Sequence, residues 1–379
     1  MPRREKAPAA KSMTDDERIA AIRLIRSENV GPVTFRDLLQ HYSSPSAALD
    51  ALPELSRRGG YRNPIRICSA REARDELQRA TGFGAQMLVV GEEAYPSPLA
   101  ALDAPPPVLY AKGDIGLLQR PTIAIVGSRQ CSAAGMRLAA QFGAQIGRAG
   151  FVIASGLARG IDAAAHQASL DTGTIAVLAG GLDSVYPPEH DNLQRTIGER
   201  GCLVSERAFG VVPRGKDFPR RNRIVSGLSL GVIIVEAARR SGSLVTARLA
   251  AEQGREVFAV PGHPLDPRAE GTNQLLKSGA TLVTDADDIL SALTPMTRTP
   301  APYLREDAEP LALAPPSLTE PDRDRVLAAL GPAPIDVDSL VRGSGLTIRH
   351  VQVALMELAL AGRIERHGSG LVSLRLLQG

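Results

Sequence analysis

The sequence predicts an α/β protein built around a doubly wound, mostly parallel sheet. Between residues 121 and 293, short apolar, β-branched runs alternate with segments of helical periodicity. The runs are apolar throughout, which is typical of strands that helices cover on both faces. Glycines stand where helix C-termini are expected, at Gly150, Gly173, Gly201 and Gly254. Together these observations indicate a central Rossmann-like domain over residues 108–293.

The N-terminal part of the chain is predicted to be helical. Residues 1–13 are basic and rich in proline and alanine, and we expect a disordered tail rather than a signal peptide. Residues 14–95 begin with helical periodicity, and Asn29-Val30-Gly31-Pro32 then separates two helices. This pattern resembles a helix-hairpin-helix, or SAM-like, domain, whose turn can present backbone N–H groups to a DNA phosphate. An ordinary helical hairpin that packs its own core is the alternative.

The central domain follows a Pro/Ala-rich stretch and a short strand over residues 108–111. We expect its main strands at Thr122–Val126, Phe151–Ser155, Thr174–Ala179, Cys202–Ser205, Gly231–Val235, Glu256–Val260 and Thr281–Val283. We expect helices between them at Ala133–Arg148, Gly160–Leu170, Glu189–Arg200, Ser243–Gln253 and Thr272–Ser278.

The C-terminal part is predicted to be a linker and a small domain. Seven prolines and no periodic pattern between residues 295 and 321 indicate a linker over 294–321. Residues 322–379 then show three helical periodicities followed by two short strand patterns on either side of His367-Gly368-Ser369-Gly370. This order predicts a winged helix.

Composition excludes several classes of protein. The net charge is only +3, aromatic residues make up 3%, and tryptophan is absent, so stacking on bases cannot be widespread. The three cysteines are far apart and form no CxxC or Cys/His cluster, so we expect reduced thiols in a cytoplasmic protein and no metal. No apolar run approaches the ~20 residues of a membrane span.

Two small-residue turns carry the strongest functional signal. Gly127-Ser128-Arg129 follows the first main strand, and Gly156 to Gly160, which includes Arg159, follows the second. Carboxyl ends of parallel strands meet at one sheet edge, where ligands bind. Backbone N–H groups, helix N-termini and arginine forks are suited to phosphates. We therefore expect a phosphate-binding edge.

Common nucleotide motifs do not fit this edge. A dinucleotide fingerprint needs a glycine where Arg129 stands and a carboxylate after the second strand, which here ends in Ser155-Gly156. The run from Gly210 to Lys216 has P-loop spacing, but Asp217 replaces the Ser/Thr that holds Mg²⁺, and Pro213 lacks an N–H. We also expect Pro219 to prevent a long helix from starting at the lysine. We predict no NAD, no ATP and no other cofactor.

A basic segment extends the edge. Residues 214–223 carry five cations and one anion. Phe218 stands among Lys216, Arg221, Asn222 and Arg223, and such an aromatic residue can stack on a base while guanidinium groups hold phosphates. A solvated basic loop is the alternative. Ser241, Gly242 and Ser243 open a later helix, where they can cap the helix or bind an anion.

The motifs taken together resemble the DprA/Smf family, bacterial DNA-processing proteins of natural transformation. The matching runs lie in the family's order at residues 125–129, 155–162, 165–166, 179–183, 186–187, 218–224, 241–247, 261–262 and 271–273. The resemblance implies an extended Rossmann-like domain that binds single-stranded DNA, forms a homodimer, protects incoming DNA and helps load RecA recombinase on it. It implies phosphate contacts by Arg129, Arg159, Arg221 and Arg223, a base contact by Phe218, and close backbone approach at Gly156 and Gly160.

Two alternatives remain open. A phosphoribohydrolase-like enzyme would draw its acid/base groups from Asp162, His166, Asp183 and Glu236, but the glutamate of that family's motif is missing. We predict no catalytic residues. A winged-helix transcription regulator would read duplex DNA, but Arg349, His350 and Gln352 give its last helix little charge. We therefore expect a secondary role for the winged helix.

Overall fold

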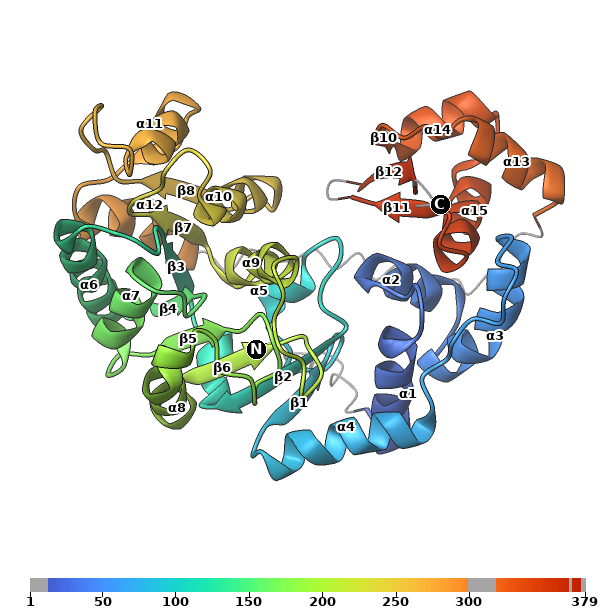
Figure 1. Ribbon diagram of the computed structural model, residues 1–379, viewed down its shortest axis with the longest axis horizontal. Coiled ribbons are helices and arrows are strands. Elements are labelled where there is room, and N and C mark those ends of the chain that lie inside the picture. The colour runs from blue at the N-terminus through green and yellow to red at the C-terminus, as the bar shows by residue number, and fades with distance from the viewer. Residues whose placement is uncertain (1–12, 299–317, 368–369, 376–379) are drawn as a thin grey trace, which may run out of the picture. The chain divides into compact units, whose positions relative to one another are not determined.

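The computed structural model describes residues 13–298, 318–367 and 370–375 (Figure 1). The described residues form two compact units. A helical unit contains those within 1–77, 103–108 and 304–379, and a sheet unit contains those within 78–102 and 109–303. The predicted tail over 1–13 and the predicted linker over 294–321 fall mainly outside the described residues.

The sheet unit confirms the predicted α/β class. Its described residues form one sheet with strand order β1-β2-β6-β5-β4-β3-β7-β8-β9 (Figure 1). The pairs formed among strands β3 to β9 are all parallel, whereas β2 pairs antiparallel with β6. The strands are β1 (Gln86–Val89), β2 (Val108–Gly113), β3 (Thr122–Val126), β4 (Val152–Ser155), β5 (Thr174–Val177), β6 (Cys202–Ser205), β7 (Gly231–Ile234), β8 (Glu256–Ala259) and β9 (Thr281–Leu282).

The strand order reverses direction at β3. From β3 the chain proceeds to β4, β5 and β6 on one side and later returns to β7 and β8 on the other. Loops that leave such neighbouring strands diverge to opposite faces of the sheet, and ligands bind in the crevice between them. The switch point between β3 and β7 therefore places a binding crevice between the loops that follow these two strands.

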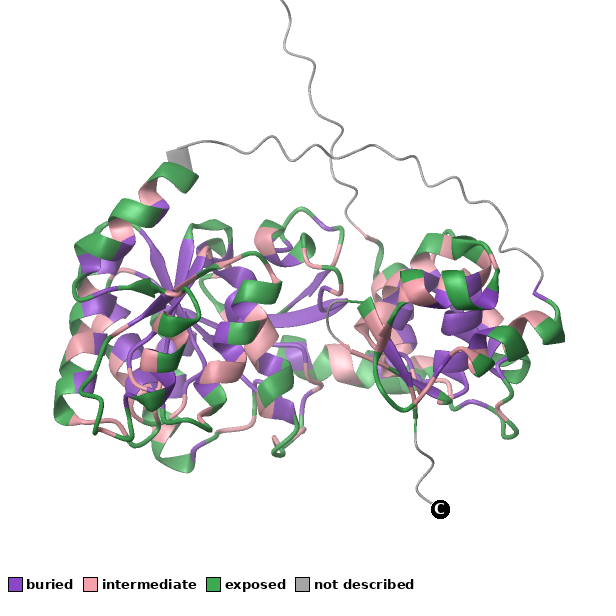
Figure 2. Cartoon of the chain, turned by 90° about the horizontal axis from the view of Figure 1, so that it is seen from above, coloured by how far each residue is buried: buried purple, intermediate pink, exposed green. Residues whose placement is uncertain are grey.

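Helices cover the sheet on both faces, so every residue of β3 to β7 is buried, whereas both residues of the last strand, β9, are exposed (Figure 2). One core packs β3, β4 and β7 against α6, α7 and α12, with Phe142, Ile161 and Ile289 in it. The other core packs the opposite face against α9 and α10, with Ile224 and Ala247 in it. The helices and 3₁₀ turns are α5 (Ser97–Ala100), η1 (Ile115–Gln119), α6 (Ala133–Arg148), α7 (Ile161–Ser169), η2 (Pro188–His190), α8 (Asp191–Arg200), α9 (Asp217–Leu228), α10 (Gly242–Glu252), α11 (Glu270–Lys277) and α12 (Ala286–Arg298).

Helix α9 corrects the prediction for the basic segment. We expected Pro219 to prevent a long helix from starting at Lys216, but α9 begins at Asp217 and continues for 12 residues. Proline is tolerated in a first helical turn because N–H groups there have no acceptor within the helix. Much of the basic segment is therefore helix rather than loop, which fixes the directions of Phe218 and Arg221.

The helical unit begins with helices that show clear N-terminal signals. Thr14 and Glu17 form a capping box at the first helix, and the next two helices each begin with a proline, at Pro32 and Pro45. Asn29, in the turn between the first two helices, has a positive φ of 58°. The bounds are α1 (Asp15–Arg26), α2 (Pro32–His41), α3 (Pro45–Arg58) and α4 (Ala70–Gly82), of which α4 continues into the sheet unit.

The C-terminal part of the helical unit has the predicted winged-helix order. Three helices precede a β-hairpin, and an additional short strand, β10, pairs with the second hairpin strand. The elements are α13 (Glu320–Ala328), β10 (Ile335–Asp336), α14 (Val337–Ser344), α15 (Ile348–Leu360), β11 (Ile364–Arg366) and β12 (Leu371–Leu374). The tip of the predicted hairpin, Gly368-Ser369, lies outside the described residues.

Candidate nucleic-acid interface

A cleft of about 860 Å³ lies at the carboxyl edge of the parallel strands. We call it the switch-point cleft, because the loops after β3 and β7 both line it. The loop after β4 and the first turns of α9 contribute as well. Eleven of the fourteen predicted site residues line the cleft: Gly127, Ser128, Arg129, Gly156, Arg159, Phe218, Arg221, Asn222, Ser241, Gly242 and Ser243. The remaining three, Gly160, Lys216 and Arg223, do not line it.

A carboxylate from the loop after β7 holds the turn after β3 in place. Glu236, just after β7, accepts hydrogen bonds from the Ser132 N–H at 2.9 Å and the Ser132 hydroxyl at 2.6 Å. The same hydroxyl caps α6 by accepting from the N–H of Gly135. These bonds connect the loops on both sides of the switch point. Arg129, at the front of the turn, is exposed, and no acidic partner is recorded for it within the described residues.

The turn after β4 packs directly against the first turn. A Cβ atom at Gly160 would lie 2.5 Å from the carbonyl oxygen of Ser128, and Gly160 has a φ of +75°, so both space and backbone conformation require glycine. Asp162 accepts from the N–H groups of Gly156 at 3.1 Å and Ala158 at 3.3 Å. The Asp162 carboxylate therefore occupies the two N–H groups that would otherwise face a phosphate. The turn therefore differs from the open anion-binding turn that the sequence predicts.

Arg221 has a different environment from the exposed phosphate ligand that the sequence predicts. Its side chain reaches into the sheet edge, only 6% of the residue is exposed, and its guanidinium donates to the carbonyls of Gly156, at 2.5 Å, and Val177. Burial lowers the pKa of Arg221 to about 10, and Asp162 opposes this effect. Burial likewise raises the pKa of Asp162, and Arg221 opposes it. Arg221 and Asp162 thus compensate each other's charge beneath the cleft.

Other predicted cations have acidic neighbours. Arg159 pairs with Glu189 on η2, and both side chains remain about half exposed, at 60% and 47%. The hydrogen bond from Arg159 lowers the pKa of Glu189 to about 2. Arg223 pairs with Glu206, which is itself buried, and this pair is largely removed from solvent. The Arg223 side chain is thus engaged by Glu206, and neither residue lines the cleft.

An aromatic pair forms part of the cleft wall. The rings of Phe218 and Tyr186 lie 5.1 Å apart between centroids, and the Arg129 guanidinium lies 5.1 Å from the Phe218 ring centroid. Tyr186 is 42% exposed. The prediction included Phe218 but not Tyr186, which follows β5 in a loop distant in sequence from the basic segment. Gln130 and Arg240 are further lining residues that it lacked.

The start of α10 closes the cleft on the far side of the switch point. The Ser241 hydroxyl caps α10 by accepting from the Ser243 N–H at 3.3 Å, and the two hydroxyls are 2.7 Å apart. Asn222 donates its side-chain amide to the carbonyl of Gly242, which joins α9 to α10. The described contacts give Ser241 the capping role and give Asn222 a bridging role.

Comparisons with known proteins identify the family. The model of DNA recombination-mediator protein A matches residues 86–294, a DprA-like N-terminal HHH domain matches 15–79, and a DprA winged helix domain matches 309–370. Protein Smf of Escherichia coli strain K12 is 42% identical over 297 residues, which cover 76% of this chain and 77% of that protein. The chain belongs to the DprA/Smf family.

Further DprA proteins agree with this assignment. DNA processing protein DprA of Streptococcus pneumoniae is 44% identical over 202 residues, or 53% of this chain and 71% of that one. Its X-ray structure superposes with a TM-score of 0.61 at 35% identity, covering 74% of this chain and 98% of that chain. A Helicobacter pylori DprA structure, described for its single-stranded DNA binding mode, has a TM-score of 0.51 at 32% identity over 56% of this chain and 96% of that one.

The acid/base groups of the enzyme alternative have other roles in this DprA/Smf chain. His166 is fully buried, and its Nδ1 lies 2.7 Å from the Thr174 hydroxyl. Asp183 accepts from the N–H of Gly210. Asp162 orders the second turn and Glu236 anchors the first, as described above. The structure therefore assigns each of these four side chains a contact that supports the fold.

His166 makes the stability of the protein depend on pH. Burial lowers its pKa from 6.5 to about 3, with Arg221 adding to this effect. Between these values the unfolded chain binds a proton that the folded chain does not, so stability is lost as pH falls below 6.5. Between pH 7.5 and 5.5 we expect His166 to contribute a loss of about 1.4 kcal/mol in unfolding free energy. Urea unfolding of wild type and His166→Gln at both pH values checks this, because the variant lacks the contribution. An equal pH dependence in both proteins would contradict it.

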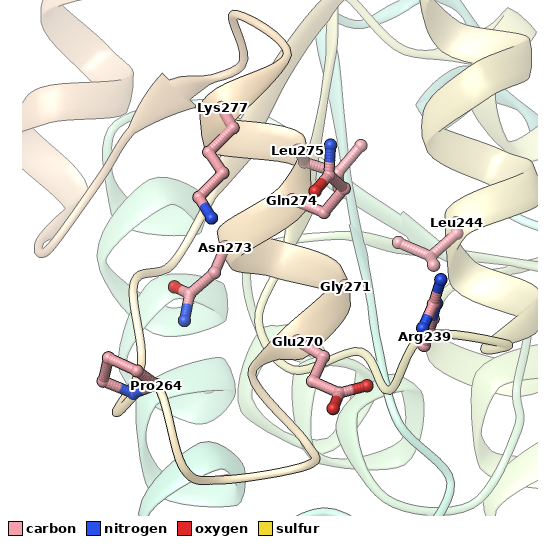
Figure 3. Close-up of a pocket in the computed structure, with 9 residues that line it drawn as sticks. All are labelled: Arg239, Leu244, Pro264, Glu270, Gly271, Asn273, Gln274, Leu275 and Lys277. Carbon is pink, nitrogen blue, oxygen red and sulfur yellow. The ribbon is translucent and has the colours of Figure 1, made fainter.

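A second pocket, of about 450 Å³, lies beside α11 (Figure 3). Leu244 and Leu275 supply apolar groups, and Arg239, Glu270 and Lys277 supply charges. Asn273 closes the chain reversal by donating to the Gly262 carbonyl and accepting from its N–H, at 3.0 and 3.2 Å. The two motifs at 261–262 and 271–273 thus serve as chain-reversing elements.

Two further observations concern the described residues alone. No group of three or more His, Cys, Asp or Glu side chains is placed to hold a metal ion within them. None of their helices combines the length and the apolar character that a bilayer crossing requires.

Proposed function

We propose that the chain binds single-stranded DNA in the switch-point cleft. The observation that carries the proposal is the Phe218–Tyr186 aromatic pair with Arg129 beside it, at the mouth of an open cleft. Aromatic faces that stack bases next to cations that hold phosphates are the usual components of single-strand binding sites. The Helicobacter pylori relative, described for its single-stranded DNA binding mode, supports the same class of ligand.

The proposed roles follow from exposure. Arg129 contacts a phosphate, and Arg159 contacts another after exchanging Glu189 for it. Phe218 and Tyr186 stack on bases. The half-buried Ser128 of the first turn allows close approach of the sugar-phosphate backbone. Gly156 is buried, and a Cβ there would lie 2.5 Å from the Arg221 guanidinium, so glycine at this position makes room for Arg221. The charge on Lys216, which stands at the N-cap of α9 and is exposed, adds attraction at longer range.

We further propose that binding has little sequence preference. Every base has a π face, so stacking tolerates any sequence, whereas preference requires side chains that read base edges. The cleft wall offers rings and guanidinium groups. Of the two amide side chains that line it, Gln130 and Asn222, the second already donates to the Gly242 carbonyl. Measured affinities for oligo-dT, oligo-dA and a mixed sequence of equal length are expected to agree within about tenfold, in line with differences in stacking strength.

Arg129→Ala tests the site through salt dependence. Removing one phosphate contact from a single strand lowers the slope of log affinity against log salt by roughly 0.7. Affinity for oligo-dT at low salt is expected to fall by about tenfold or more, because hydrogen bonds to charged groups are strong. Arg195→Ala removes the same charge from the exposed side of α8 and is the control. Unchanged slope and affinity in Arg129→Ala would reject the assigned contact.

Glu189→Gln tests the exchange at Arg159. Glu189 competes with phosphate for this arginine, so its neutralisation is expected to tighten oligo-dT binding about two- to fivefold at low salt, the range of an exposed ion pair. Fluorescence anisotropy measures the affinity. The exposed Glu199→Gln on α8 removes the same charge and serves as the control. Weaker binding by Glu189→Gln would show that the carboxylate supports the site.

We also propose the family's larger role for this chain: protection of incoming DNA and loading of RecA recombinase during natural transformation, in the cytoplasm. The match to the recombination-mediator family model supports this. We propose that the sheet unit forms a homodimer. Its last strand, β9, pairs with β8 on one side, and Leu282 on it is 53% exposed. Light scattering of the full chain tests the dimer, and the rate of RecA filament formation on coated single strands tests loading.

A further inference from the structure

From Val353 onward, the last helix of the winged helix is covered on all sides. Every residue from Val353 to Ala361 is buried, including the charged Glu357. A helix with one face in solvent leaves exposed residues in every turn. In helix-turn-helix proteins the second helix of the motif, here α15, keeps an outer face free to enter the major groove of duplex DNA. Most of that face is not free in this chain.

The covering elements come from both ends of the sequence. Helices α13 and α14 pack on α15 from within the winged helix, and α2 and α3 of the N-terminal part pack on it as well (Figure 1). All of these elements belong to the helical unit. The N-terminal helices therefore occupy the surface through which a winged helix commonly meets DNA.

A glycine, Gly59, allows α3 and α15 to approach each other closely. A Cβ atom at Gly59, just after α3, would lie 2.0 Å from the carbonyl oxygen of Glu357 and 2.9 Å from Cβ of Ala361. The φ of Gly59 is −68°, a value that any residue adopts. The N-terminal helices by themselves therefore do not require glycine here. Contact with α15 does.

The hairpin turn of the N-terminal helices caps α15. The side-chain amide of Asn29 donates to the carbonyl oxygen of Leu360 at 2.9 Å. The last carbonyls of a helix have no partner within it, so this bond satisfies one of them. Asn29 lies in the helix-hairpin-helix turn, whose backbone N–H groups could otherwise meet a DNA phosphate. The turn and α15, both candidates for DNA binding, thus contact each other.

An ion pair joins the same two parts. Asp37 on α2 lies 2.6 Å from Arg366 on β11, and the two side chains are only 10% and 16% exposed. Because this pair is buried, each charge requires the other: removing one side chain would leave the remaining charge without compensation. The wing strand is therefore attached to α2, next to the packing of α15.

We propose that α15 is a docking helix for α2, α3 and the Asn29 turn of the same chain, and that the winged helix does not read duplex DNA while it is docked. The N-terminal helices and the winged helix then act as one closed module. This inference does not depend on DNA binding in the switch-point cleft, which lies in the other unit.

Cleavage of the full chain tests the docking. A site for a sequence-specific protease is inserted after residue 308, and the protein is cut under native conditions. The C-terminal fragment is expected to co-elute with the rest of the chain in size-exclusion chromatography. Separation of the wild-type fragments would overturn the proposal.

Matched glycine variants locate the contact. After cleavage, Gly59→Ala is expected to release the C-terminal fragment, whereas Gly343→Ala, whose Cβ would make ordinary contact at 3.6 Å, is expected to retain it. Circular dichroism of the intact variants separates loss of docking from loss of folding. Arg366→Ala is a second variant, expected to weaken retention without altering α3. Full retention by both Gly59→Ala and Arg366→Ala would overturn the proposed interface.

Duplex binding by the intact chain tests the functional consequence. The exposed residues of α15 lie near its start, at Ile348, Arg349 and Gln352, and the last two carry the polar groups that could read a base edge. If α15 read base pairs, replacing both Arg349 and Gln352 with alanine would weaken binding to a mixed 30-base-pair duplex by roughly tenfold or more. We expect less than a twofold change. A tenfold loss would overturn the proposal, while oligo-dT binding measured in parallel reports the cleft separately.

Discussion

A chain carrying Phe218→Leu is expected to lose most of its affinity for single-stranded DNA while it keeps its fold. Leucine keeps an apolar side chain at the cleft wall but offers no π face to a base. Stacking of one base on an aromatic ring contributes roughly 1–3 kcal/mol, so the dissociation constant for oligo-dT should rise about five- to 150-fold. Because no charge is removed, the salt slope should stay at its wild-type value, in contrast to Arg129→Ala.

Tyr186 extends the same prediction. Its ring lies 5.1 Å from that of Phe218, so the two residues form one platform and their effects should not add independently. We expect Tyr186→Leu to weaken binding less than Phe218→Leu does, and the double variant to lose less than the sum of the two. Fluorescence anisotropy at fixed salt measures all three.

Phe83→Leu is the control for general loss of an aromatic ring. Phe83 also belongs to an edge-to-face pair, with Phe209 at 5.7 Å, but it does not line the switch-point cleft. Its replacement should leave the affinity for oligo-dT unchanged. If Phe218→Leu bound oligo-dT with wild-type affinity, the proposed stacking on Phe218 would be wrong, and the proposed function would lose its main support.

Local sequence signals predicted the sheet and the position of the cleft. The strands at β3 and β4 begin and end within one residue of the predicted positions, because buried parallel strands are continuous apolar runs and their following turns are rich in small residues. The carboxyl edge of a parallel sheet then brings these turns together whatever the details of the loops. Eleven predicted residues line one cleft for this reason.

The roles of the individual arginines were harder to predict. Arg221 stands in a basic run and has the sequence context of a surface residue, yet its partner Asp162 lies in a helix that precedes it by two strands. Glu206 and Glu189 likewise approach arginines from other elements. Such pairings depend on tertiary structure, and a local window of sequence contains no signal for them.

The contacts that cover α15 were hard to predict for the same reason, because they depend on tertiary structure. The periodicity of residues 348–360 correctly predicts a helix, but its second buried face packs on helices from the other end of the chain. From the sequence alone, the apolar residues on that face are indistinguishable from winged-helix core. The scarcity of charge near Arg349 was the signal that this helix is a poor reader of duplex DNA.

Arg221→Met is expected to destabilise the sheet unit strongly. This result would distinguish a role of Arg221 in supporting the fold, as its contacts indicate, from the phosphate contact that the sequence predicts. The substitution leaves the carbonyls of Gly156 and Val177 without their donor and Asp162 without its compensating cation. A buried acceptor left without its donor costs about 1–3 kcal/mol, and the uncompensated Asp162 carboxylate adds to this cost. Urea unfolding at pH 7.5 measures the loss.

The pH dependence of this loss has a definite sign. Burial already raises the pKa of Asp162, and without Arg221 this pKa should rise further above its value in the unfolded chain. A carboxyl group with a raised folded-state pKa favours folding at low pH and opposes it as pH rises through that pKa. The difference in stability between wild type and Arg221→Met should therefore be largest near neutral pH and shrink on acidification.

A second substitution separates charge compensation from loss of packing. Asp162→Asn added to Arg221→Met removes the uncompensated carboxylate, while its amide oxygen can still accept from the N–H groups of Gly156 and Ala158. The double variant should regain part of the lost stability and lose the added pH dependence. DNA binding then decides between the two roles of Arg221. If the residue positions the second turn, the folded double variant keeps the wild-type salt slope. If it contacts a phosphate, the slope falls by roughly 0.7 and Arg221→Met alone leaves stability almost unchanged.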